Sequence, residues 1–167
     1  MIDQLRAKAV RSAPALFWLS GVEDILFPFD FFVLGTPLSL QARSTSLRRW
    51  KDTVAQAAAA RIRERDIQTF LLPSSLAITI YCFPIAPMGG DIDNIVKPIL
   101  DALIGVVYLD DRMIEMVTVQ KFEPEVAWEI SSQSQQLALT LDHLSASEAS
   151  TPVVYVHIAD DLSWRRR

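Results

Sequence analysis

The sequence contains very little cysteine or histidine. Its 167 residues include one cysteine, Cys82, and two histidines, His143 and His157. One cysteine can form neither an internal disulfide nor a cysteine-based zinc site, and we expect Cys82, in an apolar run, to belong to the core. No combination of Ser, Cys and His forms a visible catalytic triad. These shortages argue against a disulfide scaffold, a cysteine-based zinc site and a covalent nucleophile.

Long hydrophobic runs are also missing. No window approaches the roughly 18 apolar residues that a membrane-spanning helix needs. The opening segment places Arg6, Lys8 and Arg11 before a short apolar stretch, which is the general order of a signal peptide. Against a signal peptide, Asp3 lies in this leader and no typical small-residue cleavage site follows the stretch. We therefore expect a cytoplasmic protein without a membrane segment.

The chain lacks an overall positive charge. Its net charge is −4 and its pI about 5.1, which by itself argues against a nucleic-acid-binding protein. The stretch from Arg43 to Arg65 nevertheless has seven basic and two acidic residues, a local charge of +5, so the remainder sums to −9. A local basic face can bind phosphates even when the total is acidic. The alternative is that these charges are only a solvated helix surface.

The composition is typical of one globular domain. Half of the residues are hydrophobic, enough to bury a core in a chain of this length. We expect the folded domain to span residues 29–160. Residues 1–28 would then be an amino-terminal extension, and residues 161–167 a basic carboxy-terminal tail.

The hydrophobic pattern predicts an α/β (α+β) domain with the element order β-α-β-α-β-β. Two main helices would pack on one face of a mixed sheet. Ser44, Thr45 and Ser46 offer N-cap oxygens to the first helix. The predicted strands are Phe29 to Leu34, Leu76 to Phe83, Ile114 to Lys121 and Val153 to Ile158, with further strand at Trp128 to Ile130 and Leu137 to Leu141; the predicted helices are Leu47 to Arg65 and Asn94 to Ile104.

Carboxylates are concentrated between Gly89 and Lys121. If the second helix runs through Asp93, Lys97 and Asp101, their spacing of four places all three on one face. Clustered carboxylates in a low-dielectric setting repel one another and raise each other's pKa, and a divalent cation would relieve this repulsion. The five aspartates of this segment are Asp91, Asp93, Asp101, Asp110 and Asp111.

The carboxylates suit a hard cation. Mg²⁺ prefers oxygen ligands and usually takes one or two protein carboxylates, completing its octahedron with water and substrate phosphate. Asp91 and Asp93 flank the start of the predicted helix, and Asp111 can approach from the turn before the next strand. With Lys97 nearby, this set is suited to phosphodiester hydrolysis, in which metal and ammonium stabilise the developing negative charge.

Each of these residues also has a purely structural interpretation. Asp93 or Asn94 could be the helix N-cap, which is compatible with metal binding by a neighbour. Asp101 could only pair with Lys97, and the two aspartates before the third strand could form an ordinary turn. Spacing alone leaves a metal site and a structural cluster equally open, and it assigns no reaction.

Two motifs carry a resemblance to a known family. D-I-D-N-x-x-K-x-x-x-D-A-L, beginning at Asp91, and Y-L-D-D-R-M-I, beginning at Tyr108, resemble the core motif of RusA-type Holliday junction resolvases. Upstream, F-x-V-L-G-T-P-L-S and R-R-W-K are similar to that family's amino-terminal strand and first helix. The resemblance covers about Phe29 to Lys121.

The resemblance implies a homodimer that uses Mg²⁺ or Mn²⁺ and makes paired nicks in branched DNA. It implies three essential aspartates and a lysine, supported by neighbours that orient the ligands. By motif, the catalytic residues are Asp91, Asp93, Asp111 and Lys97, with the three aspartates as metal ligands; Asn94, Asp101 and Asp110 are the supporting residues, and Arg43, Arg48, Arg49 and Lys51 would bind DNA.

One departure from the family pattern concerns DNA contact. A typical member carries basic residues just before the first aspartate, whereas this sequence has Pro87, Met88, Gly89 and Gly90. The expected function is a Mg²⁺-dependent endodeoxyribonuclease that resolves four-way junctions in DNA recombination and repair. The alternatives are a catalytically weak protein that binds branched DNA, and a Mg²⁺-dependent phosphodiesterase acting on another nucleic acid.

Overall fold

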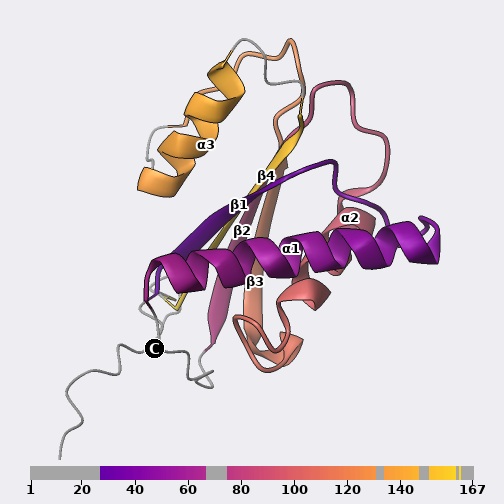
Figure 1. Ribbon diagram of the computed structural model, residues 1–167. Helices are drawn as coiled ribbons and strands as arrows, with labels where there is room; N and C mark the ends of the chain where they lie inside the picture. Colours follow the sequence, from indigo (N-terminus) through magenta and orange to yellow (C-terminus); the bar gives the residue numbers. More distant parts are fainter. Residues whose placement is uncertain (1–26, 67–74, 131–133, 147–150, 161, 163–167) are drawn as a thin grey trace, which may run out of the picture.

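The protein forms a four-stranded sheet with helices on both faces (Figure 1). The computed structural model describes residues 27–66, 75–130, 134–146, 151–160 and 162. Most of the predicted amino-terminal extension and of the basic tail therefore lies outside the described residues. The elements are β1 (Phe29–Leu34), α1 (Ser44–Glu64), β2 (Leu76–Phe83), α2 (Ile92–Leu103), the 3₁₀ turn η1 (Asp111–Met113), β3 (Ile114–Lys121), α3 (Gln135–Ser145) and β4 (Val153–Ala159).

The sheet is mixed, as predicted. Its strand order is β1-β4-β2-β3, and β4 pairs antiparallel with both β1 and β2. β2 and β3 are parallel and are joined by a crossover through α2. The edges of the sheet are therefore β1 and β3.

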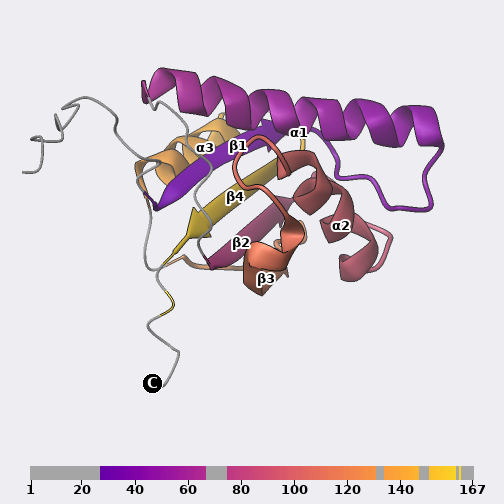
Figure 2. The same cartoon turned by 90° about the horizontal axis from the view of Figure 1, so that it is seen from below.

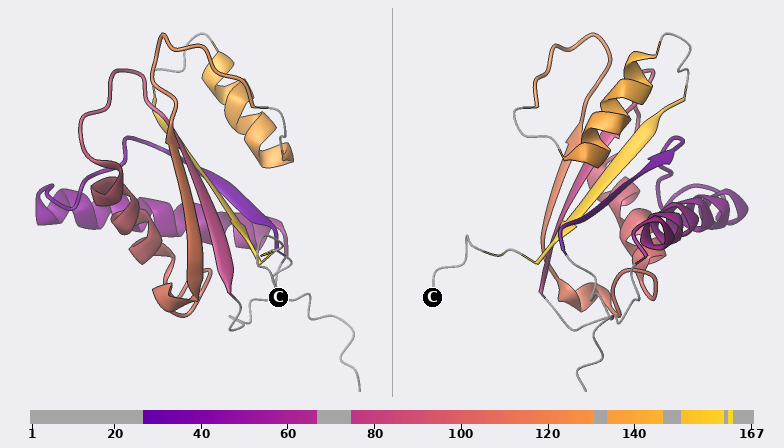
Figure 3. Two further views of the ribbon diagram at one scale, coloured as in Figure 1. Left: turned by 180° about the vertical axis from the view of Figure 1, so that it is seen from behind. Right: turned by 60° about the vertical axis from the view of Figure 1, so that its left-hand side comes forward.

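Two helices cover one face of the sheet and the third lies on the other (Figures 2 and 3). α1 and α2 pack on the main core, to which alternate residues of the strands contribute, because successive side chains of a strand point to opposite faces. α3 packs on β1 and β4 at the opposite face. A smaller cluster of buried residues belongs to that side: Phe83, Phe122, Leu137, Val153 and Tyr155.

α1 begins earlier than predicted. It spans Ser44–Glu64, and its N-cap is Arg43, whose side chain makes no capping hydrogen bond. The expected capping by the three hydroxyl residues at positions 44–46 is therefore wrong, because these residues already lie in the first turn. The buried residues recur every four positions and form one stripe: Trp50, Val54, Ala58 and Ile62.

α2 starts at Ile92 and its N-cap is Asp91, which makes no side-chain capping bond. Capping by Asp93 or Asn94 is therefore wrong as well, because both residues lie inside the first turn. The rest of the helix is strongly apolar and packs against the sheet and α1.

A proline inside α2 fixes the loop that leads into α1. Pro98 has no N–H, so the carbonyl of Asn94 lacks its usual partner four residues later. The backbone N–H of Leu40 donates to this carbonyl at 3.0 Å. The chain before α1 is therefore attached to the first turn of α2.

The segment after β3 differs from the prediction. Leu137–Leu141, expected as strand, lies within α3, and Trp128–Ile130 forms no strand. The side chain of Ser134 accepts a hydrogen bond from the N–H of Leu137 at 3.0 Å and so caps this helix. None of the helices in the described ranges is long and apolar enough to cross a membrane.

Candidate active site

α2 lies along β3 and runs in the opposite direction (Figure 3). Lys121, the last residue of β3, donates through Nζ to the carbonyl of Gly90, just before α2 begins. Asp111, just before β3 begins, contacts Lys97 in the middle of α2. The start of α2 therefore lies at the end of β3, and Asp111 lies toward the other end of that strand.

A chain of alternating charges connects α1, α2 and η1. Lys97 Nζ lies 2.8 Å from Asp101 Oδ1 and 2.8 Å from Asp111 Oδ2. Lys51 Nζ on α1 lies 2.7 Å from Asp101 Oδ2. The predicted pairing of Asp101 with Lys97 is confirmed. Two lysines thus neutralise two carboxylates within the protein.

These contacts shift the pKa values of Lys97, Asp101 and Asp111. Hydrogen bonds to Asp101 and Asp111 raise the pKa of Lys97. The hydrogen bond from Lys97 lowers the pKa of Asp111. Burial raises the pKa of Asp101, but hydrogen bonds from Lys51 and Lys97 outweigh it, so the pKa lies below its ordinary value. The pKa values of both carboxyls fall, the opposite of the rise expected from clustering.

Asp91 and Asp93 have a different environment. Both are exposed at the start of α2, and their side chains make no hydrogen bond or ion pair with the described residues. Asp110, by contrast, accepts a hydrogen bond from the N–H of Arg112 at 2.9 Å and caps η1, which confirms an ordinary turn role for that residue. The open carboxylates are therefore those at the amino-terminal end of α2, where the helix dipole favours negative charge.

The aspartates of this site differ in how available their oxygens are to a metal ion. In the described part of the chain, no three His, Cys, Asp or Glu side chains converge to hold a metal ion. Mg²⁺ usually takes only one or two protein carboxylates and fills its remaining positions with water and phosphate oxygens. The oxygens of Asp91 and Asp93 fit this chemistry because no protein cation occupies them, whereas an oxygen of Asp111 is bound by Lys97.

The loop before Asp91 is held by the end of β3. Lys121 Nζ donates to the carbonyls of Gly90, at 2.8 Å, and Met88, at 3.3 Å. The N–H of Met88 donates to Glu123 at 3.2 Å. Lys121 thus brings a positive charge to the loop before Asp91, in which positions 87 to 90 carry no basic residue. Sequence reasoning missed this residue, because only the parallel pairing of β2 and β3 shows that the end of β3 reaches the start of α2.

A buried tyrosine supports the other end of α2. Tyr108 is fully buried, and its hydroxyl donates to the carbonyl of Leu100 at 2.6 Å. Burial raises the pKa of Tyr108, so the hydroxyl keeps its proton. Carbonyls in the last turn of a helix lack intrahelical partners, and Tyr108 supplies one. This role was also missed, although Tyr108 belongs to the motif itself.

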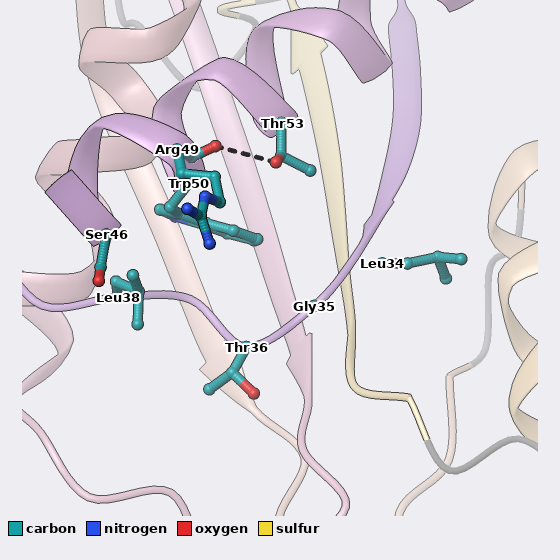
Figure 4. Close-up of a pocket in the computed structure, with 8 residues that line it drawn as sticks. All are labelled: Leu34, Gly35, Thr36, Leu38, Ser46, Arg49, Trp50 and Thr53. Carbon is teal, nitrogen blue, oxygen red and sulfur yellow. Dashed lines mark hydrogen bonds between the residues drawn. The ribbon is translucent and has the colours of Figure 1, made fainter.

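The four basic residues predicted to bind DNA, at and near the start of α1, divide into two groups. Arg43, Arg48 and Arg49 are exposed, and none has a carboxylate of the described residues within ion-pair distance. Arg49 also lines a hollow of about 310 Å³ beside Trp50, between the start of α1 and the end of β1 (Figure 4). Lys51 is instead bound to Asp101. Of these four residues, the three arginines have no ion pair with the described residues and are therefore available to contact phosphate.

Comparison with known proteins gives one family. The family model described as endodeoxyribonuclease RusA matches residues 40–131, more than half of the chain. The matched region contains α1, α2, η1 and β3, and with them every site residue predicted from the sequence. A search of the curated proteins found no match.

Proposed function

Because the chain belongs to the RusA endodeoxyribonuclease family, whose activity is that of an endonuclease on Holliday junctions, we propose that it is a Mg²⁺-dependent resolvase of four-way DNA. We further propose that it acts in recombination and repair, in the cytoplasm, as a homodimer. A four-way junction has two symmetry-related strands, and a two-fold protein can present one active site to each of them.

One observation carries the proposal. Asp91 and Asp93 are left open on α2, whereas Asp101 and Asp111, on the same side of the domain, are neutralised by lysines. Open carboxylates at a fixed helix end are available to a hard cation. We propose Asp91, Asp93 and Asp111 as the metal ligands, with Mn²⁺ as a possible substitute for Mg²⁺. When bound, the ion would polarise the scissile phosphate and activate water.

The protonation state of Lys97 limits the role that this residue can have in catalysis. Its two carboxylate partners raise its pKa, so it stays protonated at neutral pH. It therefore cannot serve as a general base, and its contribution is a positive charge beside the reacting phosphate. We propose that an incoming phosphate competes with the carboxylates for this ammonium and so releases Asp111 for the metal. Asp101 then retains its bond to Lys51 and keeps the position of α2 unchanged.

We propose that DNA approaches along the start of α1. Arg43, Arg48 and Arg49 would contact phosphates on this side, and Lys121 would hold the loop that bears the first aspartate. Phosphate contacts of this kind position a duplex without reading its sequence.

A second candidate function is a catalytically weak protein that binds branched DNA. The observation that favours it is the absence of three converging acidic side chains in the described residues, together with the missing basic run before Asp91. Under this hypothesis the protein binds junctions but does not cut them.

One experiment separates these functions. The full-length protein is incubated with labelled four-way junction, linear duplex and single strand, with Mg²⁺ and with a chelator, and binding is measured in parallel without metal. Junction-selective nicking that requires Mg²⁺ supports the resolvase. Junction binding without nicking supports the weak binder. Equal cleavage of all three DNAs would indicate a general phosphodiesterase and overturn the proposal.

A further inference from the structure

The two edge strands of the sheet, β1 and β3, differ in their contacts with the rest of the protein. At the β1 edge, Arg61 on α1 donates from Nε to the carbonyl of Asp30 at 3.2 Å. Arg65, at the end of α1, donates to the carbonyl of Pro28 at 3.1 Å. Edge strands present unpaired backbone groups to other chains, and these arginines occupy two such carbonyls. The start of the β1 edge is therefore less available for pairing with another chain.

The other edge of the sheet is β3. Among the described strands, β3 pairs only with β2 and is the last strand of the sheet. Met116 is 36% exposed and Val117 38% exposed, on opposite faces, and no charged residue lies between positions 116 and 120. The pairing of β3 with β2 is irregular near Glu115 and regular from Met116 onward, so the regular and uncharged part of this edge is Met116 to Gln120. A regular, uncharged stretch with exposed apolar side chains is a template for pairing with another strand.

We propose that a second copy of this chain covers the edge, with the β3 strands of the two copies pairing antiparallel about a two-fold axis at Thr118. The inference rests on the proposed function, from which it takes the need for two active sites. It specifies the surface by which the homodimer forms. The result is one continuous sheet of eight strands, four from each copy.

The sequence of β3 is suited to pairing with itself. In this register Thr118 faces the partner's Thr118, and Val117 faces the partner's Val119. β-branched pairs directly opposite one another stabilise antiparallel strands. The exposed Met116 would lie beside the uncharged Gln120 of the partner, so no like charges meet at the centre of the interface.

The residues beyond both ends of β3 extend this complementarity. Leu109 lies nine positions before Thr118, and Val126 and Trp128 lie eight and ten positions after it. All three are exposed, by 53%, 62% and 43% respectively. These residues lie outside β3 and its register. Antiparallel pairing brings the start of one strand to the end of the other, so exposed apolar side chains of both copies flank each end of the interface.

The symmetry of this pairing suits the proposed substrate. A two-fold axis that relates adjacent antiparallel strands is perpendicular to the sheet, so both copies place α1 and α2 on the same face of it. The two acidic sites and both sets of arginines then face one DNA molecule. Pairing through the opposite face of the sheet would direct the two sites away from each other.

Two measurements test the interface on the full-length protein. Sedimentation velocity from nanomolar to tens of micromolar should give a species of twice 18.7 kDa at the upper end. Met116→Lys should shift this equilibrium to monomer by at least about tenfold in concentration, because lysine is a residue by which natural edge strands prevent pairing. Leu139→Lys, an exposed position on α3, is the matched control and should leave the equilibrium unchanged.

Cross-linking tests the register. Directly opposite residues of antiparallel strands have Cα atoms about 4.5 to 5.5 Å apart, within the range that a disulfide spans. Thr118→Cys should therefore form a covalent dimer under mild oxidation, and Gln135→Cys on α3 should not. Cys82 will not interfere, because it is buried and burial raises its pKa to about 11.

The outcomes separate this inference from the proposed function. A monomer at all concentrations, or a dimer that Met116→Lys does not weaken and Thr118→Cys does not cross-link, would overturn the β3 interface even if junctions are cut. A dimer with both expected responses supports the interface even if the junction assay shows no cleavage.

Discussion

Two sets of charged side chains lie on the same side of the domain and differ in whether they form ion pairs within the protein. In the first set, which we call the paired set, every ammonium is bound to a carboxylate of the protein. In the second, the open set, no residue has an ion pair with the described residues. The paired set consists of Lys51, Lys97, Asp101 and Asp111, and the open set consists of Asp91, Asp93, Arg48 and Arg49.

The comparison teaches that residue type does not decide the role of a charge in this protein. Asp91 and Asp101 are ten positions apart on one helix, yet only Asp101 has lysine partners. A carboxylate held by two lysines, as Asp101 is, contributes to stability and is little available to a ligand. An open carboxylate, such as Asp91, contributes little to stability and remains available. Substitutions of Asp91 and of Asp101 should therefore change different measurements.

The largest expected effect is on cleavage. Asp91→Asn, and separately Asp93→Asn, should reduce Mg²⁺-dependent junction cleavage by at least about 100-fold, because even residues that only orient metal ligands typically contribute 10- to 100-fold. Junction binding and the metal-free melting temperature should stay close to wild type. Added Mg²⁺ should raise the melting temperature of the wild type only.

A structural role for Asp91 or Asp93 would give the opposite result. If either aspartate were structural, its asparagine variant would melt lower without metal and would still cut. That result would remove the residue from the open set.

The next effect concerns DNA affinity. Replacing Arg48 and Arg49 together by alanine should reduce the slope of log affinity against log salt by about 2, because each phosphate contact contributes about 0.9. Arg63→Ala, an exposed arginine in the last turn of α1, is the control and should leave the slope unchanged. An unchanged slope in the double variant would mean that these arginines are only solvated surface.

A smaller effect is expected on stability. Asp101→Asn removes the partner of two lysines and should lower the free energy of unfolding by about 1 to 2 kcal/mol. This corresponds to a fall in melting temperature of about 2 to 8 °C for a chain of this size. Thermal unfolding with and without Mg²⁺ should show the same loss in both conditions. A loss that disappears with Mg²⁺ would place Asp101 among the metal-binding residues.

The smallest expected effect is the pH dependence of the stability lost in the Asp101→Asn variant. The pKa of Asp101 in the folded protein lies below its unfolded value of about 3.9. Its stabilising contribution is therefore present above that pH and is lost as the pH falls through the folded pKa. The stability difference between wild type and Asp101→Asn should narrow below about pH 4, measured by urea unfolding from pH 7 to pH 2.5. A difference that stays constant over this range would contradict an ionic role.

Much of the fold could be predicted, because the relevant signals are local. The first three strands match their predicted bounds, and β4 extends one residue further, to Ala159. Their β-branched and aromatic runs end at prolines, glycines or polar turns. The Asp93, Lys97 and Asp101 spacing also predicted the ion pair within α2 correctly.

α3 was missed because two periodicities compete in its sequence. Leu137, Leu139 and Leu141 alternate as in a strand, whereas Leu137, Leu141 and Leu144 recur as in a helix. The structure buries Leu137 and leaves Leu139 49% exposed, as a helix requires. The cap at Ser134 was the available signal that favoured the helix.

Apart from the Lys97–Asp101 pair, the ion pairs and hydrogen bonds of the site could not be predicted from the sequence. Lys51 and Asp101 are fifty positions apart, and only the packing of α1 on α2 brings them together. The same holds for Lys121, whose carbonyl partners precede it by more than thirty positions. Sequence identified the carboxylates, and tertiary structure decided which of them are neutralised.

The proline in α2 has a consequence for local motion. The amide of Leu40 lies outside any helix or strand, where backbone hydrogens usually exchange rapidly with solvent. Here its hydrogen is held by the carbonyl that Pro98 leaves vacant in α2. Exchange at Leu40 should therefore report the opening of α2, more than fifty positions away. An alanine at position 98 would supply a competing N–H within the helix and detach the loop, giving faster exchange at Leu40 while the helix itself becomes more protected.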